Sequence, residues 1–450
     1  MFKLIKNFKE LAKDRIKADL LEILEEGLKV ANPRYAVKKA LKINGGELYV
    51  KGRVFKLRGE LFVIGFGKAS FEMAKEIEEI LGDRISGGAI ITPFKPKEKL
   101  SKVLVLIGDH PIPTERNVTN ARRILELVKD LREEDLVLVL ISGGGSALFS
   151  LPPEGISIRD KARITELLMK SGADINELNA VRKHISLVKG GQLSKAIWPA
   201  TTVSLIISDV VGDKLDTIAS GPTAPDETTF KDAYDVLRRK NLLDVAPRSV
   251  VRYIEKGIRG EVRETPKLND PIFSKTHNFI IASNVMSLKA MKELAVRKGY
   301  NSMIISSHVQ GEAREVGKFI SSIMWSIHRD SIPVSRPACI IMGGETTVTV
   351  KGSGVGGRNQ ELALSVGIEI EGMERASFAS IGSDGVDGVS SAAGALVDGR
   401  TMKRARELNL DSWEFLDNND SFTFFSKMKN AILTGPTGTN VNDFMVALLA

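Results

Sequence analysis

Residues 136–147 read LVLVLISGGGSA, and this segment decides the fold class of the chain. Its first half is an uninterrupted aliphatic run, which is typical of a strand buried on both faces of a parallel sheet. Three glycines, Gly143–Gly145, follow at once. Because an ordinary tight turn has no need of such costly backbone freedom, we interpret them as a nest of backbone amides that binds phosphate. A merely flexible turn is the alternative.

The same alternation of short apolar runs and longer amphipathic segments continues along most of the chain. Strands are predicted at residues 61–64, 103–107, 136–141, 203–207, 279–282, 303–305, 338–342 and 378–381. Helices are predicted at residues 70–81, 115–131, 158–170, 286–298, 312–328 and 359–370. This order predicts βαβ units with mainly parallel sheets, so the fold class is α/β.

The chain has 450 residues, about three times the length of an average domain. Residues 264–271 contain two prolines and many charges without any period, which is typical of a linker. We therefore predict two α/β domains, residues 1–260 and 261–450. Two amphipathic helices at residues 11–30 and 35–41 are expected to pack on the first domain.

The composition excludes several classes of protein. Lys and Arg number 64 and Asp and Glu 56, a net charge of +8, but acidic residues are interleaved with the basic ones, so nucleic-acid binding is not predicted. Apolar runs fall far short of the ~18 residues of a membrane span. The first 19 residues lack the apolar core of a signal peptide. The chain has a single cysteine, Cys339, so an internal disulfide is excluded. Because this usage suits a reducing compartment, we expect a cytoplasmic protein. Scarce glutamine with abundant Lys and Glu follows the trend of thermophile proteins.

A second glycine loop, residues 65–70, reads GFGKAS and lies between a predicted strand and a predicted helix. It resembles half of a dinucleotide fingerprint, but Ser70 stands where the third glycine belongs, and it is not a Walker loop. The helix N-terminus offers free N–H groups to an anion, and Lys68 is placed to neutralise phosphate oxygens. A plain turn with a solvated lysine is the alternative. The residues that we assign to nucleotide phosphate binding are Gly65, Gly67, Ser142, Gly143, Gly144, Gly145 and Ser146.

A basic segment at residues 179–191 concentrates Arg182, Lys183, His184 and Lys189 within eight positions. A planar guanidinium with neighbouring ammonium groups suits a clamp for a substrate carboxylate or for phosphates. A solvated basic helix face is the alternative. We assign Arg182 and Lys189 to substrate binding.

Several acidic residues follow predicted strands. Asp209 ends an apolar strand, where a carboxylate can reach a metal or a substrate hydroxyl, and a turn cap is the alternative. Asp384 and Asp387 stand three residues apart in a turn-prone segment. Because Mg²⁺ is held by one or two carboxylates together with phosphate oxygens, we predict that these two bind it.

Two further polar positions lie in the second half of the chain. Arg358 opens a predicted helix, where its charge opposes the helix dipole, so an anion is expected to compensate it. Asn440 belongs to the small polar loop 437–443, which either lines a polar cleft or forms a capped turn. We assign Asn440 to substrate binding.

The histidines show no metal-ligand spacing, so we predict that each caps or packs: His110, His184, His277, His308 and His328. Cys339 lies within a predicted strand and is expected to be an inert core residue.

Together these motifs resemble one family, the glycerate 2-kinases with a MOFRL-type C-terminal domain. The stretches that match are 65–70, 110–113, 142–148, 179–191, 208–212, 219–223, 343–345, 356–361, 383–388 and 437–443. The resemblance implies two Rossmann-like α/β domains, a glycerate kinase domain and a MOFRL-type domain, with the active site in the cleft between them. It also implies phosphorylation of the 2-hydroxyl of D-glycerate by ATP with Mg²⁺, giving 2-phosphoglycerate and ADP.

The family's suspected catalytic lysine and arginine map onto Lys68 and Arg358, and with Asp209 they form our predicted catalytic set. The sequence departs from the family at Ser391, where an aspartate is common, and at Thr114, where an acid is common. No role is therefore assigned to residue 391.

Two other functions remain open from the sequence. An NAD(P)H-dependent hydroxypyruvate reductase would use residues 65–70 as its dinucleotide loop, but no ribose-binding acid ends the next strand; Asp83 is near the right distance, at a helix end. A sensor of phosphorylated metabolites would keep the glycine loops without needing Asp209, Asp384 and Asp387. The oligomeric state is not determined by the sequence, and a homodimer is one option.

Overall fold

The structure is a computed structural model that describes residues 3–450. The chain forms two compact units, residues 36–281 and the remainder, which combines residues up to 35 with 282–450. We name them the central unit and the terminal unit after their places in the sequence. The division after residue 281 differs from the expected one after residue 260. Residues 264–271 are not a free linker, because Thr265 donates a hydrogen bond to the buried Asp226 at 3.0 Å and Pro266 accepts one from the Asp226 N–H.

The central unit contains a six-stranded sheet in the order β6-β5-β4-β7-β8-β9. The strands are β4 (Leu61–Phe66), β5 (Gly87–Thr92), β6 (Leu104–Ile107), β7 (Leu136–Ile141), β8 (Thr201–Ile207) and β9 (Thr276–Ala282). The pairs from β6 to β8 are all parallel, as predicted. The strand order reverses between β4 and β7, which is the point where Rossmann-type sheets bind their ligands. One of the two predicted glycine loops follows β4, and the other follows β7.

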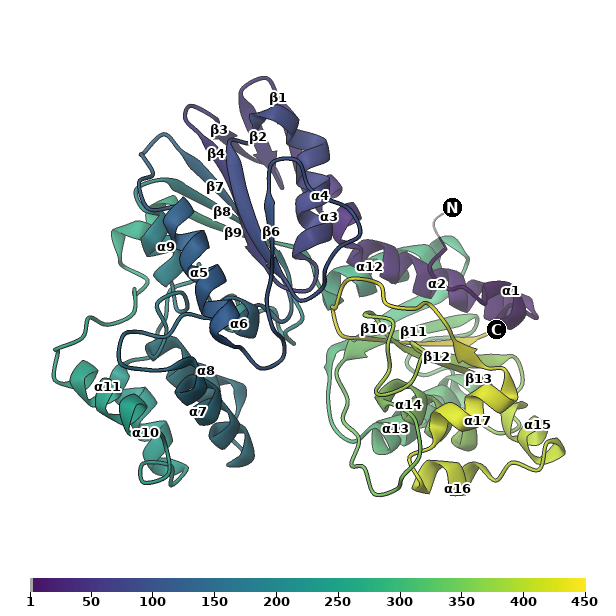
Figure 1. The fold of residues 1–450 in the computed structure, drawn as a ribbon. Coiled ribbons are helices and arrows are strands. Elements are labelled where there is room, and N and C mark those ends of the chain that lie inside the picture. The colour runs from purple at the N-terminus through teal and green to yellow at the C-terminus, as the bar shows by residue number, and fades with distance from the viewer. Residues whose placement is uncertain (1–2) are drawn as a thin grey trace. The chain divides into compact units, whose positions relative to one another are not determined.

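Helices cover both faces of this sheet (Figure 1). They include α3 (Pro33–Ala40), α4 (Ser70–Leu81), α5 (Glu115–Leu127), the short α6 (Gly145–Leu148) and α9 (Gln192–Ile197). Every residue of β7 is buried as a result. Ile64, Val137 and Val139 pack with Ala121 and Ile124 of α5, which explains the unbroken apolar run that predicted this strand.

Four more helices of the central unit have a core of their own (Figure 1). They are α7 (Ile158–Lys170), α8 (Ile175–His184), α10 (Phe230–Arg239) and α11 (Arg248–Ile258). Capping boxes at Ser157, Asp174 and Thr229 begin the first three of them. A small antiparallel sheet of β1 (Leu41–Asn44), β2 (Glu47–Val50) and β3 (Arg53–Lys56) completes the unit.

The terminal unit contains a second six-stranded sheet in the order β10-β11-β15-β12-β13-β14. Its strands are β10 (Asn301–Val309), β11 (Ala338–Gly344), β12 (Ala376–Gly382), β13 (Gly394–Asp398), β14 (Ala431–Ile432) and β15 (Asp443–Leu449). Only the pair of β10 and β11 is parallel among these strands of the described chain, because β15 inserts antiparallel between β11 and β12. The sheet is therefore mixed, whereas the sequence predicted mainly parallel strands in both domains.

The helices of the terminal unit are α1 (Phe8–Leu11), α2 (Arg15–Ala31), α12 (Asn284–Arg297), α13 (Ala313–Asp330), α14 (Arg358–Glu369), α15 (Thr401–Glu407), α16 (Ser412–Asp417) and α17 (Ser421–Met428). The expectation that the first long helix packs on the first domain is wrong. Helix α2 packs instead on α12, where a Cβ at Gly27 would lie 3.0 Å from Met291 Cγ. Its Asp19 accepts a hydrogen bond from the Tyr300 hydroxyl at 2.9 Å.

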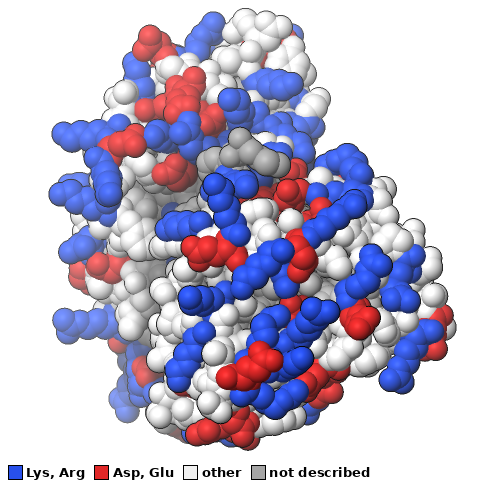
Figure 2. All heavy atoms as spheres, turned by 90° about the vertical axis from the view of Figure 1, so that its right-hand side faces the viewer, with Lys and Arg blue, Asp and Glu red and all other residues white. Residues whose placement is uncertain are grey.

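Charges of both signs are interspersed on the face of the molecule drawn in Figure 2, as the sequence pattern predicted. In the part of the chain that the structure describes, every helix is too short or too polar to cross a bilayer.

Candidate active site

The two glycine loops of the central unit are joined to each other by hydrogen bonds. The Lys68 N–H donates to the Gly143 carbonyl at 2.9 Å, and the Ala69 N–H donates to Ser142 Oγ at 3.0 Å. These bonds fix Lys68, which is half-buried, directly beside the loop that follows β7. The loops after β4 and β7 therefore form one surface at the point where the strand order reverses.

Three side chains surround the backbone of this surface. A Cβ at Gly143 would overlap the Asp209 carboxylate, and a Cβ at Gly144 would lie 3.0 Å from the His110 ring and 3.5 Å from Lys68 Cγ. Gly144 also has a φ of +81°, a conformation that side chains disfavour. The glycines are thus needed for close packing around Lys68, His110 and Asp209, which a merely flexible turn would not require.

Within residues 3–450, the N–H groups of Gly143 and Gly144 make no hydrogen bond. Unbonded neighbouring amides of this kind form an anion-binding nest. Burial, together with the charge of Lys68, lowers the pKa of His110. The ring is therefore neutral at neutral pH and adds no charge to the two positive contributions of the lysine and the nest.

A group of buried cations lies behind the same loop. The Lys189 ammonium donates to the Gly145 carbonyl at 2.9 Å and lies 5.4 Å above the Phe66 ring. Lys161, on α7, is 4% exposed, and its ammonium has no hydrogen-bond partner within residues 3–450. Burial lowers the pKa of Lys161 to about 7 and that of Arg182 to about 10, and it lowers the pKa of Lys189 strongly. The fold therefore keeps three basic side chains close together without an acidic partner, and burying their charged forms costs stability.

This arrangement predicts that Lys161→Met stabilises the protein at low pH. Between pH 7 and 10 the unfolded chain holds a proton on Lys161 that the folded chain lacks, so the free energy of unfolding rises with pH. Below pH 7 Lys161 is protonated in both the folded and the unfolded chain, so the full energetic cost of burying its charge remains. Since each pKa unit is worth about 1.4 kcal/mol, the variant should gain a few kcal/mol at pH 6 and much less at pH 10. Thermal unfolding at both pH values, with the exposed Lys170→Met as control, measures this. Equal effects at the two pH values would contradict the assignment.

The neighbouring basic residues have structural partners instead. The Lys183 ammonium contacts Asp216 at 3.1 Å and Asp226 at 3.4 Å. His184 Nε2 lies 2.8 Å from a Glu264 carboxylate oxygen. Both side chains are buried, so this segment is not a solvated basic face, and these two residues hold the helices together.

In the terminal unit, Arg358 is the first residue of α14 and forms a bidentate pair with Asp443. Its Nε and Nη2 atoms lie 2.7 and 2.9 Å from the two carboxylate oxygens, and Nη1 lies 3.0 Å from Glu345. Asp443 is fully buried, whereas the arginine side chain is 30% exposed. The anion expected to compensate Arg358 is therefore the Asp443 of this chain, and the partly exposed guanidinium also contacts Glu345.

Burial raises the pKa of Asp443 to about 6, against the lowering effect of Arg358. Burial also opposes the charge of the Arg358 guanidinium, but its hydrogen bond to Asp443 outweighs this and raises its pKa. The pair is thus held by strong mutual attraction in a poorly solvated place, where removing either partner leaves an unpaired group.

The two acids predicted to bind metal have different surroundings. Asp387 is buried and accepts four hydrogen bonds from the backbone and side-chain nitrogens of Asn359 and Gln360, at 2.8–3.3 Å. Asp387 therefore caps the first turn of α14, and both of its carboxylate oxygens already accept hydrogen bonds. Asp384, at the end of β12, is half-buried and accepts one bond from the Val386 N–H at 3.2 Å. Of the two, Asp384 is better placed to bind a cation.

Asn440 lies in a turn, where its side-chain oxygen accepts a bond from the Asn442 N–H at 3.0 Å. Among residues 3–450 no group of three or more His, Cys, Asp or Glu could hold a metal ion by itself. The predicted residues thus fall into two sets. The central unit holds the glycine loops with Lys68, Asp209, Arg182 and Lys189, and the terminal unit holds Arg358, Asp384, Asp387 and Asn440.

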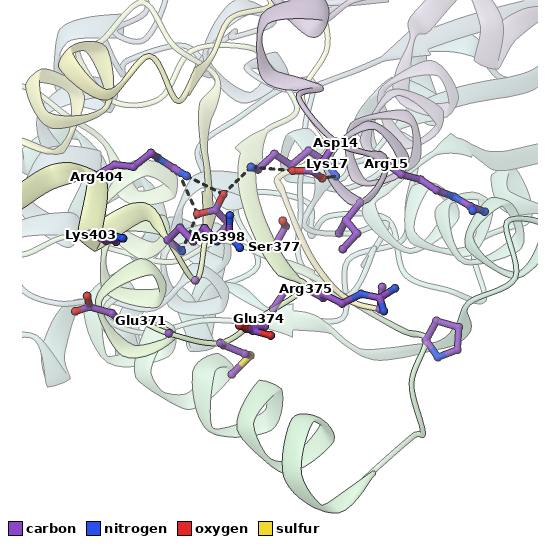
Figure 3. A pocket seen from close by; sticks show the side chains of 18 of the residues that line it. Asp14, Arg15, Lys17, Glu371, Glu374, Arg375, Ser377, Asp398, Lys403 and Arg404 are labelled. Atoms are coloured by element: carbon purple, nitrogen blue, oxygen red, sulfur yellow. Dashed lines mark hydrogen bonds and ion pairs between the residues drawn. The ribbon is translucent and has the colours of Figure 1, made fainter. Parts of the chain in front are cut away.

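The terminal unit also has a cavity of about 870 Å³, at the edge of its sheet opposite to Gly382 and Asp443. Asp398 lies in it and pairs with Lys17 at 2.6 Å and Arg404 at 3.1 Å (Figure 3). Burial opposes ionisation of Asp398, but the hydrogen bond from Lys17 outweighs it and lowers the pKa to about 2. These ion pairs tie α2 to the sheet.

Comparisons with known proteins identify relatives of both halves of the chain. Residues 19–255 match a family described as "Domain of unknown function (DUF4147)", and residues 338–443 match the MOFRL family. A glycerate 2-kinase of Pyrococcus horikoshii is 44% identical over 95% of this chain and 96% of its own length. The chain belongs to the glycerate 2-kinase family.

Other relatives are similarly close to this chain in sequence, and one of them also in its solved structure. A D-glycerate 2-kinase of Thermotoga maritima is 41% identical over 97% of this chain and 99% of its own length. The crystal structure of glycerate kinase from Thermotoga maritima has a TM-score of 0.86, with 40% identity, and covers 96% of this chain and 99% of that one. The predicted family and the α/β fold class are confirmed.

Three residues near these sites were not predicted from the sequence. Asp443 is the last residue of the polar loop 437–443 and is followed by an apolar run. An acid directly before a buried strand is the feature of the sequence that could have indicated its role. Lys161 falls on the apolar face of α7 with Ile158, Ile164 and Leu168, which by helical period indicates a buried lysine. His110 was predicted to cap or pack, although it follows a strand that ends at the same sheet edge as Lys68.

Proposed function

We propose that this protein transfers the γ-phosphoryl group of ATP to the 2-hydroxyl of D-glycerate, giving 2-phosphoglycerate and ADP. Its relatives named glycerate 2-kinases support this at 41–44% identity over nearly the whole chain. The structural observation that carries the proposal is the pair of joined glycine loops. Unbonded amides at Gly143 and Gly144 next to Lys68 suit the phosphate chain of a nucleotide.

Phosphoryl transfer needs positioning and charge neutralisation more than covalent chemistry by the protein. In our proposal the 2-hydroxyl oxygen attacks the γ-phosphorus, the bond to the bridging oxygen of ADP breaks, and the hydroxyl proton passes to Asp209. Lys68 stabilises the charge on the phosphoryl oxygens, and Arg358 is our second candidate for this role. Asn440 is a candidate for binding the acceptor.

The residues present fit a magnesium ion. Mg²⁺ is commonly held by one or two carboxylates together with substrate phosphates and water, so a preformed cluster of three acids is not required. Asp384 is our candidate ligand, whereas the oxygens of Asp387 are occupied by Asn359 and Gln360. When bound, the ion would neutralise charge on the phosphate oxygens.

Asparagine variants separate these roles. Asp384→Asn should raise the Mg²⁺ concentration needed for half-maximal rate. Asp209→Asn should lower turnover by roughly 10²-fold or more with an unchanged Mg²⁺ requirement, since general bases contribute about 10²–10⁴-fold. Asp387→Asn should chiefly lower the melting temperature. Steady-state rates across a Mg²⁺ series measure these effects, and parental behaviour of all three variants would refute the assignment.

The alternative hypothesis, in which residues 65–70 bind a dinucleotide cofactor, has little support in the structure. Ser70 Oγ is buried and donates to the Gly67 carbonyl at 2.8 Å, at the position where the fingerprint has its third glycine for close packing of the helix on the strand. The β5 strand ends at Thr92 rather than at an acid, and Asp83 lies at an exposed position paired with Lys102.

An assay with two arms tests the proposal. The full-length protein is incubated with ATP, Mg²⁺ and D-glycerate, and separately with NADH and hydroxypyruvate. We expect ADP formation that depends on D-glycerate and no oxidation of NADH. Oxidation of NADH without ADP formation would replace the kinase by the reductase, and inactivity in both arms would favour a sensor.

A further inference from the structure

A cavity of about 800 Å³ opens in the central unit beside the glycine loop. It is bounded by the segment 109–116 and by α7, and it reaches Ser146, Ser150 and Arg182. Ser146 and Ala147, the two residues that follow Gly145 in the chain, line it. The cavity is of the size that proteins use for drug-sized ligands, about 300–1,000 Å³.

The inner end of this cavity presents hydrogen-bond donors. Lys161 and Ser150 are 4% and 1% exposed, and within residues 3–450 neither the ammonium nor the hydroxyl has a partner. Arg182 lies next to them and makes no ion pair in the described chain. Buried hydrogen-bond donors without acceptors lower the stability of a protein. A ligand rich in acceptor oxygens would therefore satisfy these donors together.

The three acids that line the cavity do not supply this need. Asp109 pairs with Arg116 at 3.1 Å, and Glu166 pairs with Arg163 at 3.0 Å. Glu115, the third, is exposed, so none of the three is buried beside Lys161. The inner end therefore keeps a positive charge for a ligand.

The mouth of the cavity has a different character. Ile112 and Met169 both line it and are 67% and 58% exposed. Large apolar side chains that are exposed beside a cavity favour an apolar, flat ligand group, and the methionine sulfur adds a favourable contact to aromatic rings. The cavity thus has exposed apolar side chains beside the ion pairs at its mouth and buried basic side chains at its inner end.

We propose that this cavity binds the nucleotide of the kinase reaction, with the base against Ile112 and Met169 and the phosphate chain directed to Arg182, Lys161 and Ser150. The inference rests on the proposed kinase function and names the site of its nucleotide. A polyphosphate can accept hydrogen bonds from Lys161, Arg182 and Ser150 together, whereas the single carboxylate of glycerate has only two acceptor oxygens. A three-carbon acid would also leave most of the 800 Å³ empty.

This changes two assignments made from the sequence. Arg182 becomes a phosphate-binding residue rather than a ligand of glycerate. Lys189 becomes a positioning residue, because its ammonium is 1% exposed and donates to the Gly145 carbonyl beneath the loop.

Calorimetric titration of the full-length protein tests the proposal with four probes: a non-hydrolysable ATP analogue with Mg²⁺, inorganic tripolyphosphate, adenosine and D-glycerate. Lys161→Met should weaken binding of the ATP analogue and of tripolyphosphate by about tenfold or more, the worth of one charge-assisted contact. Ile112→Ser should weaken binding of the ATP analogue and of adenosine and leave tripolyphosphate unchanged. The exposed Lys170→Met on the same helix is the matched control.

Ile112 is exposed, so its variant tests the mouth of the cavity independently of any change that Lys161→Met makes in the interior. Unchanged binding of the ATP analogue in both variants would overturn the inference and leave the kinase function standing. Loss of D-glycerate binding alone in Lys161→Met would show that the cavity holds the acceptor and would also overturn it. In a separate titration of the parent protein with NADH, binding of NADH without binding of the ATP analogue would refute the kinase function itself.

Discussion

Lys68→Met is expected to lower turnover by about 10²-fold or more while the protein remains folded. The backbone N–H of residue 68 bonds to the Gly143 carbonyl, so the substitution keeps the joined loops and removes only the charge. Preorganised charge of this kind is typically worth ~3–4 kcal/mol of transition-state stabilisation. Steady-state turnover with ATP and D-glycerate measures the loss.

A matched control is Lys99→Met, which removes a lysine charge at an exposed position outside both glycine loops. It should keep parental turnover. An unchanged rate in Lys68→Met, with a parental melting temperature, would exclude a role for this lysine in the reaction.

The second large effect is expected for Arg358→Ala, in both activity and stability. The substitution leaves the fully buried Asp443 without its bidentate partner, which typically costs 3–5 kcal/mol, roughly, for a buried pair. The pKa of Asp443, about 6 in the parent, should rise further. A carboxyl whose folded pKa is raised loses stability as pH increases through that pKa. The destabilisation should therefore be larger at pH 8 than at pH 5, as thermal unfolding at both pH values measures.

The double variant Arg358→Ala/Asp443→Asn separates the two consequences. It removes the buried charge, so it should recover much of the stability while turnover stays about 10²-fold or more below the parent. Recovery of turnover along with stability would show that Arg358 is only structural. Failure to recover stability would show that the unpaired carboxylate is not the cause of the loss.

Much of the fold follows from local patterns in the sequence. The predicted helices at residues 70–81 and 158–170 coincide with α4 and α7 to the residue, because an apolar period of 3.6 and, for α7, a capping box at Ser157 define them. The buried strand β7 was equally clear from its aliphatic run. These signals are local, so a single sequence contains them.

Other features depend on contacts between distant segments. The apolar run that forms β15 has no period, and nothing in it indicates that it pairs between β11 and β12. The amphipathic face of α2 predicts burial but not that α12 is its partner. The prolines and charges of residues 264–271 suggested a linker, although Thr265 and Pro266 bond to Asp226 in the central unit.

The same limit applies to the candidate site. Lys68 and Gly143–Gly145 were found from the sequence because glycines after a strand are a local signal for anion binding. Asp384 and Asp387 look alike in the sequence, and only the contacts of Asp387 with Asn359 and Gln360 distinguish them. Likewise the partner of Arg358 is Asp443, 85 residues further along the chain.

The most direct test of the account is the position of the phosphate in the product. The protein is incubated with ATP, Mg²⁺ and D-glycerate, and the product is examined by phosphorus NMR with proton coupling. A phosphate on the 2-hydroxyl is attached to a carbon that carries one hydrogen and gives a doublet, which is the result that we predict. A triplet, from phosphate on the terminal CH₂ carbon, or the absence of any phosphomonoester signal, would contradict the proposed 2-kinase reaction.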